Sequence, residues 1–111
     1  MSNIYHITSQ TEWDKQKEAP VYTAESLETE GFIHASNVDQ IVPTANLIFQ
    51  GRTDLLILTI DIDLLSSEVK VEDTYGHGAH PHIYGPVDRA AIVFTVAFPP
   101  NKDGTFSLPK L

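Results

Sequence analysis

Five histidines are the side chains of this sequence best suited to proton chemistry, and two of them lie in apolar surroundings. An imidazole titrates near pH 6.5, so it can donate or accept a proton under physiological conditions. His6 follows Tyr5 in an alternating run near the start, and His34 stands in the run GFIHAS at positions 31–36. Each histidine alone is equally compatible with a buried ring that bonds a backbone carbonyl. Together they indicate two short strands that carry imidazoles into one cleft.

The three remaining histidines have the spacing H-x2-H-x-H, at His77, His80 and His82. Three imidazoles and a water molecule would form an open zinc centre. Glycines and a proline interrupt this segment, and the chain has no cysteine to supply a thiolate ligand. We therefore favour an exposed, mobile polar loop over residues 74–81 and predict no metal site, with a histidine metal protein kept as a third hypothesis.

Glu72 is the carboxylate closest to this loop, and strand alternation places it on the same face as Lys70. There it could act as a general base or stabilise an oxocarbenium-like sugar. Asp61 and Asp63 resemble the start of a calcium loop, but the glycine and the later glutamate of such a loop are absent. We interpret those two acids as solvated loop residues and keep Glu72 as the candidate.

The first half of the chain predicts short elements around these histidines. We expect a strand at residues 4–7 and then a helix at 12–18 that is capped by Ser9. A second short strand is expected at 21–23, followed by a helical turn at 25–30 that Gly31 ends. A buried strand at 32–35 then places His34 near its carboxyl end. Ser36 is expected to cap the next helix, because Asp39 stands at the capping-box position.

The second half predicts one helix and the centre of the sheet. An apolar stripe runs along residues 37–50, but Pro43 interrupts it, so we expect a first turn, a kink and a main helix from about Pro43. The continuous apolar run at 55–60 is typical of a central strand buried on both faces. Further strands are expected at 69–72, 82–84 and 90–98, the last of them the longest. The expected fold is α+β, a single domain over residues 1–111, with two main helices and a mostly antiparallel sheet, whole or split in two.

The composition limits the partners of this chain. Its 111 residues carry a formal net charge of −8, which weighs against a nucleic-acid partner because phosphate binding needs a basic surface. No apolar run approaches the roughly 18 residues of a membrane span, so no membrane partner is expected. The absence of cysteine favours a cytoplasmic location. A small anionic ligand held by backbone donors is compatible with this charge, and the sequence leaves the oligomeric state open.

Several short motifs resemble a known family. They are residues 5–7 (YHI), 30–36 (EGFIHAS), 44–46 (TAN), 58–61 (LTID), 81–86 (PHIYGP), 103–104 (DG) and 108–109 (LP). Together they are similar to the bacterial and plant family called domain of unknown function 952. More widely, the run YHIT at positions 5–8 resembles the Tyr-His-Gly-Thr opening of tRNA 2′-phosphotransferases and poly(ADP-ribose) polymerases. The strand of His34 resembles the second histidine strand of the phosphotransferases. This resemblance implies an ADP-ribosyltransferase-like fold.

The same resemblance implies a cleft that takes NAD or an ADP-ribose-type nucleotide as a substrate. The implied catalytic residues are His6, His34 and Glu72. The implied ligand contacts are Tyr5, Tyr22, Ser36, His82 and Tyr84, with Tyr22 or Tyr84 stacked on the nicotinamide ring. Ile7 replaces the glycine that those enzymes carry beside the histidine. Two hypotheses follow: an enzyme that transfers an ADP-ribosyl or related pentosyl group, and a non-catalytic module of the same fold that binds a small ligand or a protein.

Overall fold

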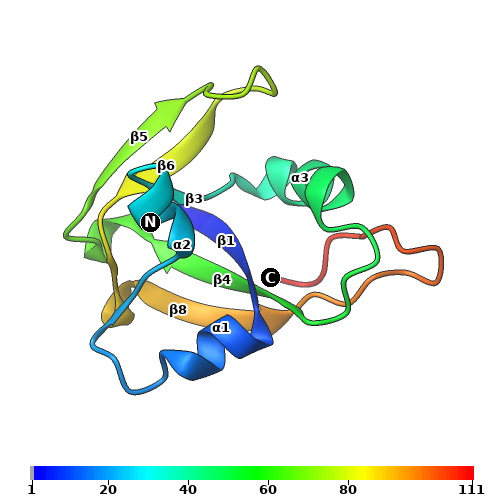
Figure 1. The fold of residues 1–111 in the computed structure, drawn as a ribbon, viewed down its shortest axis with the longest axis horizontal. Helices are drawn as coiled ribbons and strands as arrows, with labels where there is room; N and C mark the ends of the chain where they lie inside the picture. Colours follow the sequence, from blue (N-terminus) through cyan, green and yellow to red (C-terminus); the bar gives the residue numbers. More distant parts are fainter. Residues whose placement is uncertain (1) are drawn as a thin grey trace.

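The computed structural model describes residues 2–111 and divides the strands among three antiparallel sheets (Figure 1). One sheet has the strand order β1-β4-β8, formed by Asn3–Ser9, Leu55–Asp61 and Ile92–Ala97. A second has the order β3-β6-β5, formed by Ile33–His34, His80–Tyr84 and Glu68–Glu72. A two-stranded ribbon pairs β2 with β7, at Val21–Tyr22 and Val87–Asp88. The α+β class and the mostly antiparallel pairing are therefore confirmed, but the strands form three sheets and not the one or two expected.

The strand β4 forms the centre of the molecule because all of its residues are buried. On one face, Leu58 and Ile60 pack in the larger core cluster together with Ile33 of the second sheet. On the other face, Ile57 packs in a second cluster with Ile41 of the helix α3. Alternate residues of β4 thus serve two cores, which is why its sequence is apolar without alternation. The predicted doubly buried strand is confirmed.

Two helices cover opposite sides of the β1-β4-β8 sheet (Figure 1). The helix α1 spans Gln10–Lys15, and its Trp13 packs against the larger cluster. The helix α3 spans Ile41–Ile48 and contributes to the second cluster. A shorter helix, α2, spans Glu25–Thr29. Three 3₁₀ turns lie at Val38–Gln40, Ile62–Leu64 and Arg89–Ala91. Within residues 2–111, no helix has the length and apolar character that crossing a membrane requires.

The structure corrects the predicted cap at Ser36. Ser36 instead continues the extended chain after β3: its backbone pairs with Tyr5 of β1 through hydrogen bonds of 2.9 and 2.7 Å. The 3₁₀ turn that follows begins after Asn37, and the side chain of Gln40 folds back to accept the Asn37 N–H at 2.9 Å. The predicted cap at Ser9 is confirmed, because its hydroxyl accepts the Glu12 N–H at 3.1 Å.

Other element boundaries differ from the prediction for local reasons. The helix α1 begins at Gln10, two residues earlier than predicted, and ends at Lys15. The helix α3 begins at Ile41, so Pro43 falls in its first turn, where a missing N–H costs no helical hydrogen bond. The predicted longest strand at 90–98 was wrong, since its first residues form a 3₁₀ turn and β8 is shorter than β1 and β4.

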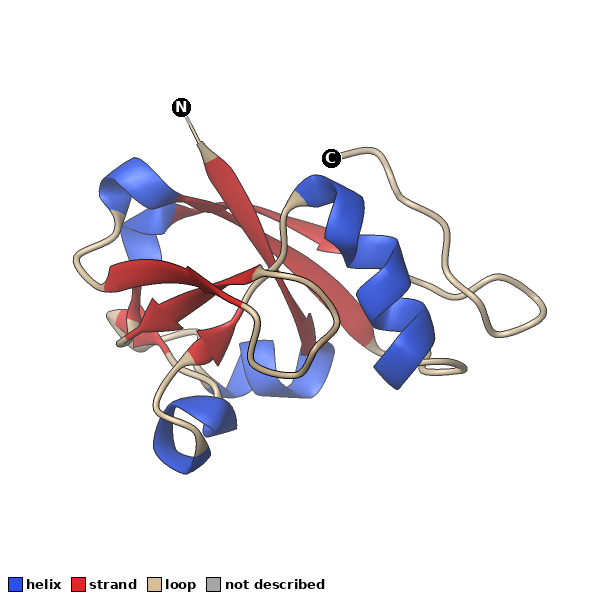
Figure 2. Cartoon of the chain, turned by 90° about the horizontal axis from the view of Figure 1, so that it is seen from above, coloured by secondary structure: helices blue, strands red, loops and turns tan. Residues whose placement is uncertain are grey.

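The loop between β5 and β6 covers residues 73–79. Seen from above, it lies between the β3-β6-β5 sheet and α3 (Figure 2). It is exposed along its length, as predicted, but it ends one residue before His80, the first residue of β6. Pro81 is therefore a buried strand residue and not part of the loop.

Candidate functional site

Strand β6 presents apolar and polar side chains to opposite faces of the β3-β6-β5 sheet. Along β6, Pro81 and Ile83 are buried on one face, whereas His80, His82 and Tyr84 share the other. The register then sets His82 opposite His34 of β3. It also sets Glu72 of β5 opposite His80, two positions along the strand from His82. One sheet face thus gathers three histidines and a carboxylate.

Backbone hydrogen bonds clamp the end of β3 between β1 and β6. The Ala35 N–H donates to the Pro81 carbonyl at 3.1 Å, while Ser36 pairs with Tyr5. The His6 Nδ1 lies 2.5 Å from the His34 carbonyl oxygen. Because a carbonyl only accepts, this nitrogen carries the proton. The imidazole of His6 therefore fixes the backbone that presents His34.

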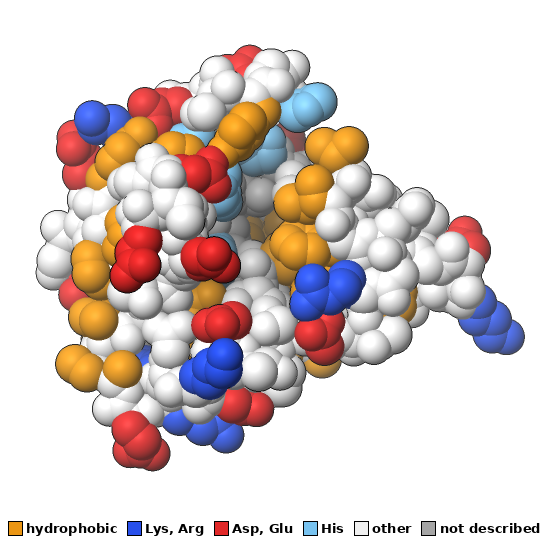
Figure 3. Space-filling model, viewed as in Figure 1, with side chains coloured by type: hydrophobic (Ala, Val, Ile, Leu, Met, Phe, Trp, Pro, Cys, Tyr) orange, Lys and Arg blue, Asp and Glu red, His pale blue; other side chains and the backbone are white. Residues whose placement is uncertain are grey.

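A pocket of about 530 Å³ opens beside this clamp, between the β3-β6-β5 sheet, β1 and α3. This volume lies within the range of about 300–1,000 Å³ that is usual for small-molecule sites. One wall is apolar and comes from β1 and α3, with Ile7, Leu47, Ile48 and Phe49. The facing wall carries His34, His77, His80 and His82 together with Glu72, Thr74 and Tyr75. Figure 3 shows the hollow, with histidine side chains on one wall and hydrophobic side chains facing them.

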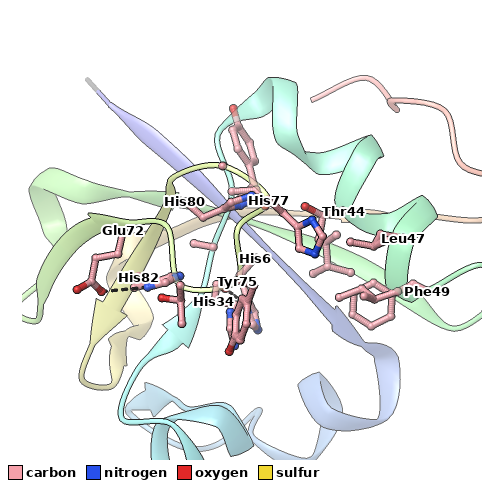
Figure 4. A pocket seen from close by; sticks show the side chains of 17 residues that line it. His6, His34, Thr44, Leu47, Phe49, Glu72, Tyr75, His77, His80 and His82 are labelled. Atoms are coloured by element: carbon pink, nitrogen blue, oxygen red, sulfur yellow. Dashed lines mark hydrogen bonds and ion pairs between the residues drawn. The ribbon is translucent and has the colours of Figure 1, made fainter.

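His82 is held by a carboxylate and by a stacked ring. Its Nδ1 lies 3.0 Å from Glu72 Oε1, to which the Tyr84 hydroxyl also donates (Figure 4 draws the His82–Glu72 contact). These two hydrogen bonds lower the pKa of the Glu72 carboxyl, and the bond to Glu72 raises the pKa of Tyr84. Phe32 stacks on the His82 ring with 4.0 Å between centroids and 13° between planes. Only 2% of His82 is exposed, so this ring is fixed in place.

His34 has its own carboxylate, from a different element. Its Nε2 lies 3.0 Å from Glu30 Oε2 at the end of α2, and Glu30 Oε1 accepts the hydroxyl of Tyr75. The Tyr75 ring also lies against His34, with centroids 5.8 Å apart. Tyr75 belongs to the loop of residues 73–79, so this set of contacts ties the loop to the site (Figure 4).

His6 borders the pocket but is committed to structure. Its second nitrogen, Nε2, lies 3.0 Å from the hydroxyl of Tyr22, which in turn lies 2.8 Å from the hydroxyl of Thr8. Burial lowers the pKa of His6 to about 4 and raises the pKa of Tyr22 to about 12, so both side chains are neutral near pH 7. With both nitrogens occupied, His6 has no free atom to offer a ligand, which matches the buried alternative considered for it.

The structure brings most of the predicted site residues together. Those that line the pocket are Tyr5, His6, His34, Ser36, Glu72 and His82, so the predicted convergence of His6, His34 and His82 on one cleft is confirmed. Two tyrosines do not line it. Tyr22 is only 1% exposed behind His6, and Tyr84 supports Glu72, so the expected stacking of either ring on a ligand is corrected.

Sequence reasoning missed the apolar wall and the carboxylate of His34. Three consecutive apolar residues, Leu47, Ile48 and Phe49, stand at the end of the helical segment. They span more of the helix surface than one core-facing stripe, so this pattern could have indicated an exposed apolar surface that binds a ligand. Glu30 stands four residues before His34, but Gly31 separates their elements. For metals, no group of three or more His, Cys, Asp or Glu side chains within residues 2–111 is placed to hold an ion.

Fold and site together define a small α+β protein with a two-walled pocket of imidazoles and apolar side chains. The chain belongs to the family described as "Protein of unknown function (DUF952)", whose model matches residues 7–95. No curated protein matches the chain.

Solved structures of the protein CC0527 from Caulobacter crescentus share this fold. Its crystal structure is 29% identical to this chain and that of a double mutant is 28% identical, both with a TM-score of 0.85. Each match covers 96% of this chain and 95% of the other. The solution structure has a TM-score of 0.84 at 29% identity and covers 97% and 94% of the two chains. These comparisons show the family and the fold.

Proposed function

We propose that the pocket binds a small nucleotide-type ligand of the NAD or ADP-ribose class. The observation that carries this proposal is the division of the pocket into an apolar wall and an imidazole wall. Such a pocket suits a flat heterocycle that also carries polar groups. The nucleotide class itself comes from the resemblance of the YHIT and GFIHAS motifs to ADP-ribosyl-handling enzymes.

The apolar wall supports a ligand because it exposes side chains that a closed core would bury. Leu47 is 61% exposed and Ile48 is 63% exposed, although α3 packs its other face into the second core cluster. Each square ångström of apolar surface covered by a ligand contributes about 25 cal/mol. Contiguous exposed apolar residues beside a concave site are typical of ligand binding.

A non-catalytic binding module is the second candidate, and the state of His6 favours it. The resemblance implies a catalytic role for His6, but both of its ring nitrogens have protein partners. Transfer chemistry would then depend on His34 and His82, which have carboxylate partners. Incubation with NAD distinguishes the candidates, since an enzyme releases nicotinamide and a binding module leaves NAD intact.

Thermal shift and calorimetry with NAD, ADP-ribose, adenosine and nicotinamide test the binding proposal. A ligand at about 100 times its dissociation constant should stabilise the fold by about 2.7 kcal/mol. Leu47→Asp places a charge on the apolar wall and should abolish this stabilisation. Leu64→Asp is the matched control, because Leu64 is also exposed but lies outside the pocket. The proposal is wrong if neither NAD nor ADP-ribose binds, or if both variants bind them as the wild type does.

A further inference from the structure

We infer that Tyr84, Glu72 and His82 form a relay that presents His82 Nε2 as a fixed hydrogen-bond acceptor in the pocket. The pocket then selects a ring ligand that carries an O–H or N–H donor and no negative charge. This inference deepens the proposed function and rests on the same pocket as the ligand site. It concerns which part of a nucleotide-type ligand enters, and it predicts the heterocyclic part, with any phosphate left in solvent.

The first step is the tautomer of His82. An ionised carboxylate only accepts hydrogen bonds, and Glu72 is kept ionised by the two donors that lower its pKa. Its Oε1 lies 3.0 Å from His82 Nδ1, so this nitrogen carries the proton. In the neutral ring the other nitrogen, Nε2, is therefore an acceptor. Within residues 2–111, Nε2 has no protein partner, and it lies on the side of the ring away from Glu72 (Figure 4).

The second step is rigidity. A fixed acceptor requires a ring that does not rotate, and His82 is packed on two sides. Phe32 lies parallel to it at 4.0 Å, and His34 meets it edge to face with centroids 5.6 Å apart. The Tyr84 hydroxyl and His82 Nδ1 both hydrogen-bond to Glu72 Oε1, so Tyr84 helps to hold this carboxylate in place. Such outer hydrogen bonds fix tautomer and orientation in the same way as the carboxylates behind metal-bound or catalytic histidines.

The third step is charge. Among residues 2–111, no lysine or arginine lines the pocket, whereas Glu72 does. The nearest cation on this strand, Lys70, lies over the Tyr84 ring at 4.8 Å and 4.0 Å from Glu68, outside the pocket lining. The net charge of −8 adds to the repulsion of anions. An acceptor nitrogen beside a carboxylate repels a phosphate or carboxylate oxygen and attracts a proton donor.

Nitrogen-15 NMR of the histidine rings tests the relay without any ligand. At a pH where the ring is neutral, His82 of the wild type should show a protonated Nδ1 and an unprotonated Nε2. Glu72→Ala removes the acceptor, so His82 should revert to a majority of the Nε2–H form. Glu68→Ala is the matched control, since Glu68 is an exposed carboxylate on the same face of the same strand, and it should leave the tautomer unchanged.

Three related probes, which differ in their N–H donors and in charge, test the ligand class. Nicotinamide is uncharged and has N–H donors, N,N-dimethylnicotinamide lacks the donors, and nicotinate is an anion without them. Titration followed by NMR should show nicotinamide binding at least about tenfold more tightly than either analogue in wild type and Glu68→Ala. Glu72→Ala should lose this preference.

The outcomes separate this inference from the proposed function. A His82 ring in the Nε2–H form, or nicotinamide binding no tighter than its two analogues, overturns the inference even where NAD binds. Failure of NAD and ADP-ribose to bind while nicotinamide keeps its preference overturns the nucleotide class and supports the relay.

Discussion

His34 and His82 lie directly opposite one another on β3 and β6, and their rings meet edge to face with centroids 5.6 Å apart. Each ring has a separate carboxylate, Glu30 from the end of α2 and Glu72 from β5. A histidine that gives one N–H to a carboxylate has its second nitrogen free for a ligand. Both rings line the same pocket, and the stability of this arrangement depends on the residues packed around them.

Phe32→Ala tests that packing. Phe32 is 6% exposed and stacks on His82, so its removal leaves a cavity beside the ring. We expect the free energy of unfolding to fall by about 3–5 kcal/mol, as for other buried phenylalanines. Urea denaturation measures this change. Phe94→Ala on β8 is the control, because Phe94 is 64% exposed and its loss should change stability by less than about 0.5 kcal/mol. Equal effects of the two substitutions would contradict a packed role for Phe32.

Local patterns predicted the site where alternation decides the outcome. The strand expected at 82–84 places His82 and Tyr84 on one face by alternation, and the strand expected around His34 supplies its partner. His80, which was assigned to the loop, lies on the same face of β6. The predicted end of the loop was wrong because proline is typical of loops, so Pro81 was assigned to the loop. In the structure Pro81 is buried in β6, opposite Val71.

Contacts between distant segments could not be predicted from the sequence. Tyr75 and Glu30 are 45 residues apart, and their hydrogen bond exists only because the β5–β6 loop reaches the end of α2. Tyr22 looked like a ligand contact because its type suits stacking, yet the fold buries it against His6. Ser36 has a strong capping preference, which its backbone pairing with β1 overrides. In each case a tertiary contact decides the role of a residue whose local signal is ambiguous.

Tyr75→Phe tests whether the loop of residues 73–79 is tied down through Glu30. The substitution keeps the ring beside His34 and removes the hydroxyl that donates to Glu30. A single hydrogen bond contributes about 0.5–1.5 kcal/mol, so opening of the loop should rise by up to about tenfold. Amide hydrogen exchange within the loop measures this opening, and amides of β4 serve as the internal reference. Unchanged exchange in the loop would show that the hydroxyl does not hold it.

The buried, neutral state of His6 makes stability depend on pH. Burial lowers the pKa of His6 from 6.5 to about 4 in the native protein. Below pH 6.5 the unfolded chain gains a proton at His6 that the native protein cannot take up until about pH 4. The unfolded state therefore binds more protons in this window, and stability falls as the pH falls through it. At about 1.4 kcal/mol per pH unit, the loss at His6 is about 2 kcal/mol between pH 7 and pH 5.

Comparison with His6→Gln isolates this contribution. Glutamine does not titrate, and the other ionisable groups are common to both proteins, so they cancel in the difference between the two pH profiles. The substitution lowers stability at pH 7, because it disturbs bonds to the His34 carbonyl and the Tyr22 hydroxyl. Urea denaturation at several pH values should then show the gap between wild type and variant narrowing by about 2 kcal/mol from pH 7 to pH 5. A constant gap would mean that His6 titrates alike in both states, and a widening gap would mean that the native protein holds His6 as a cation.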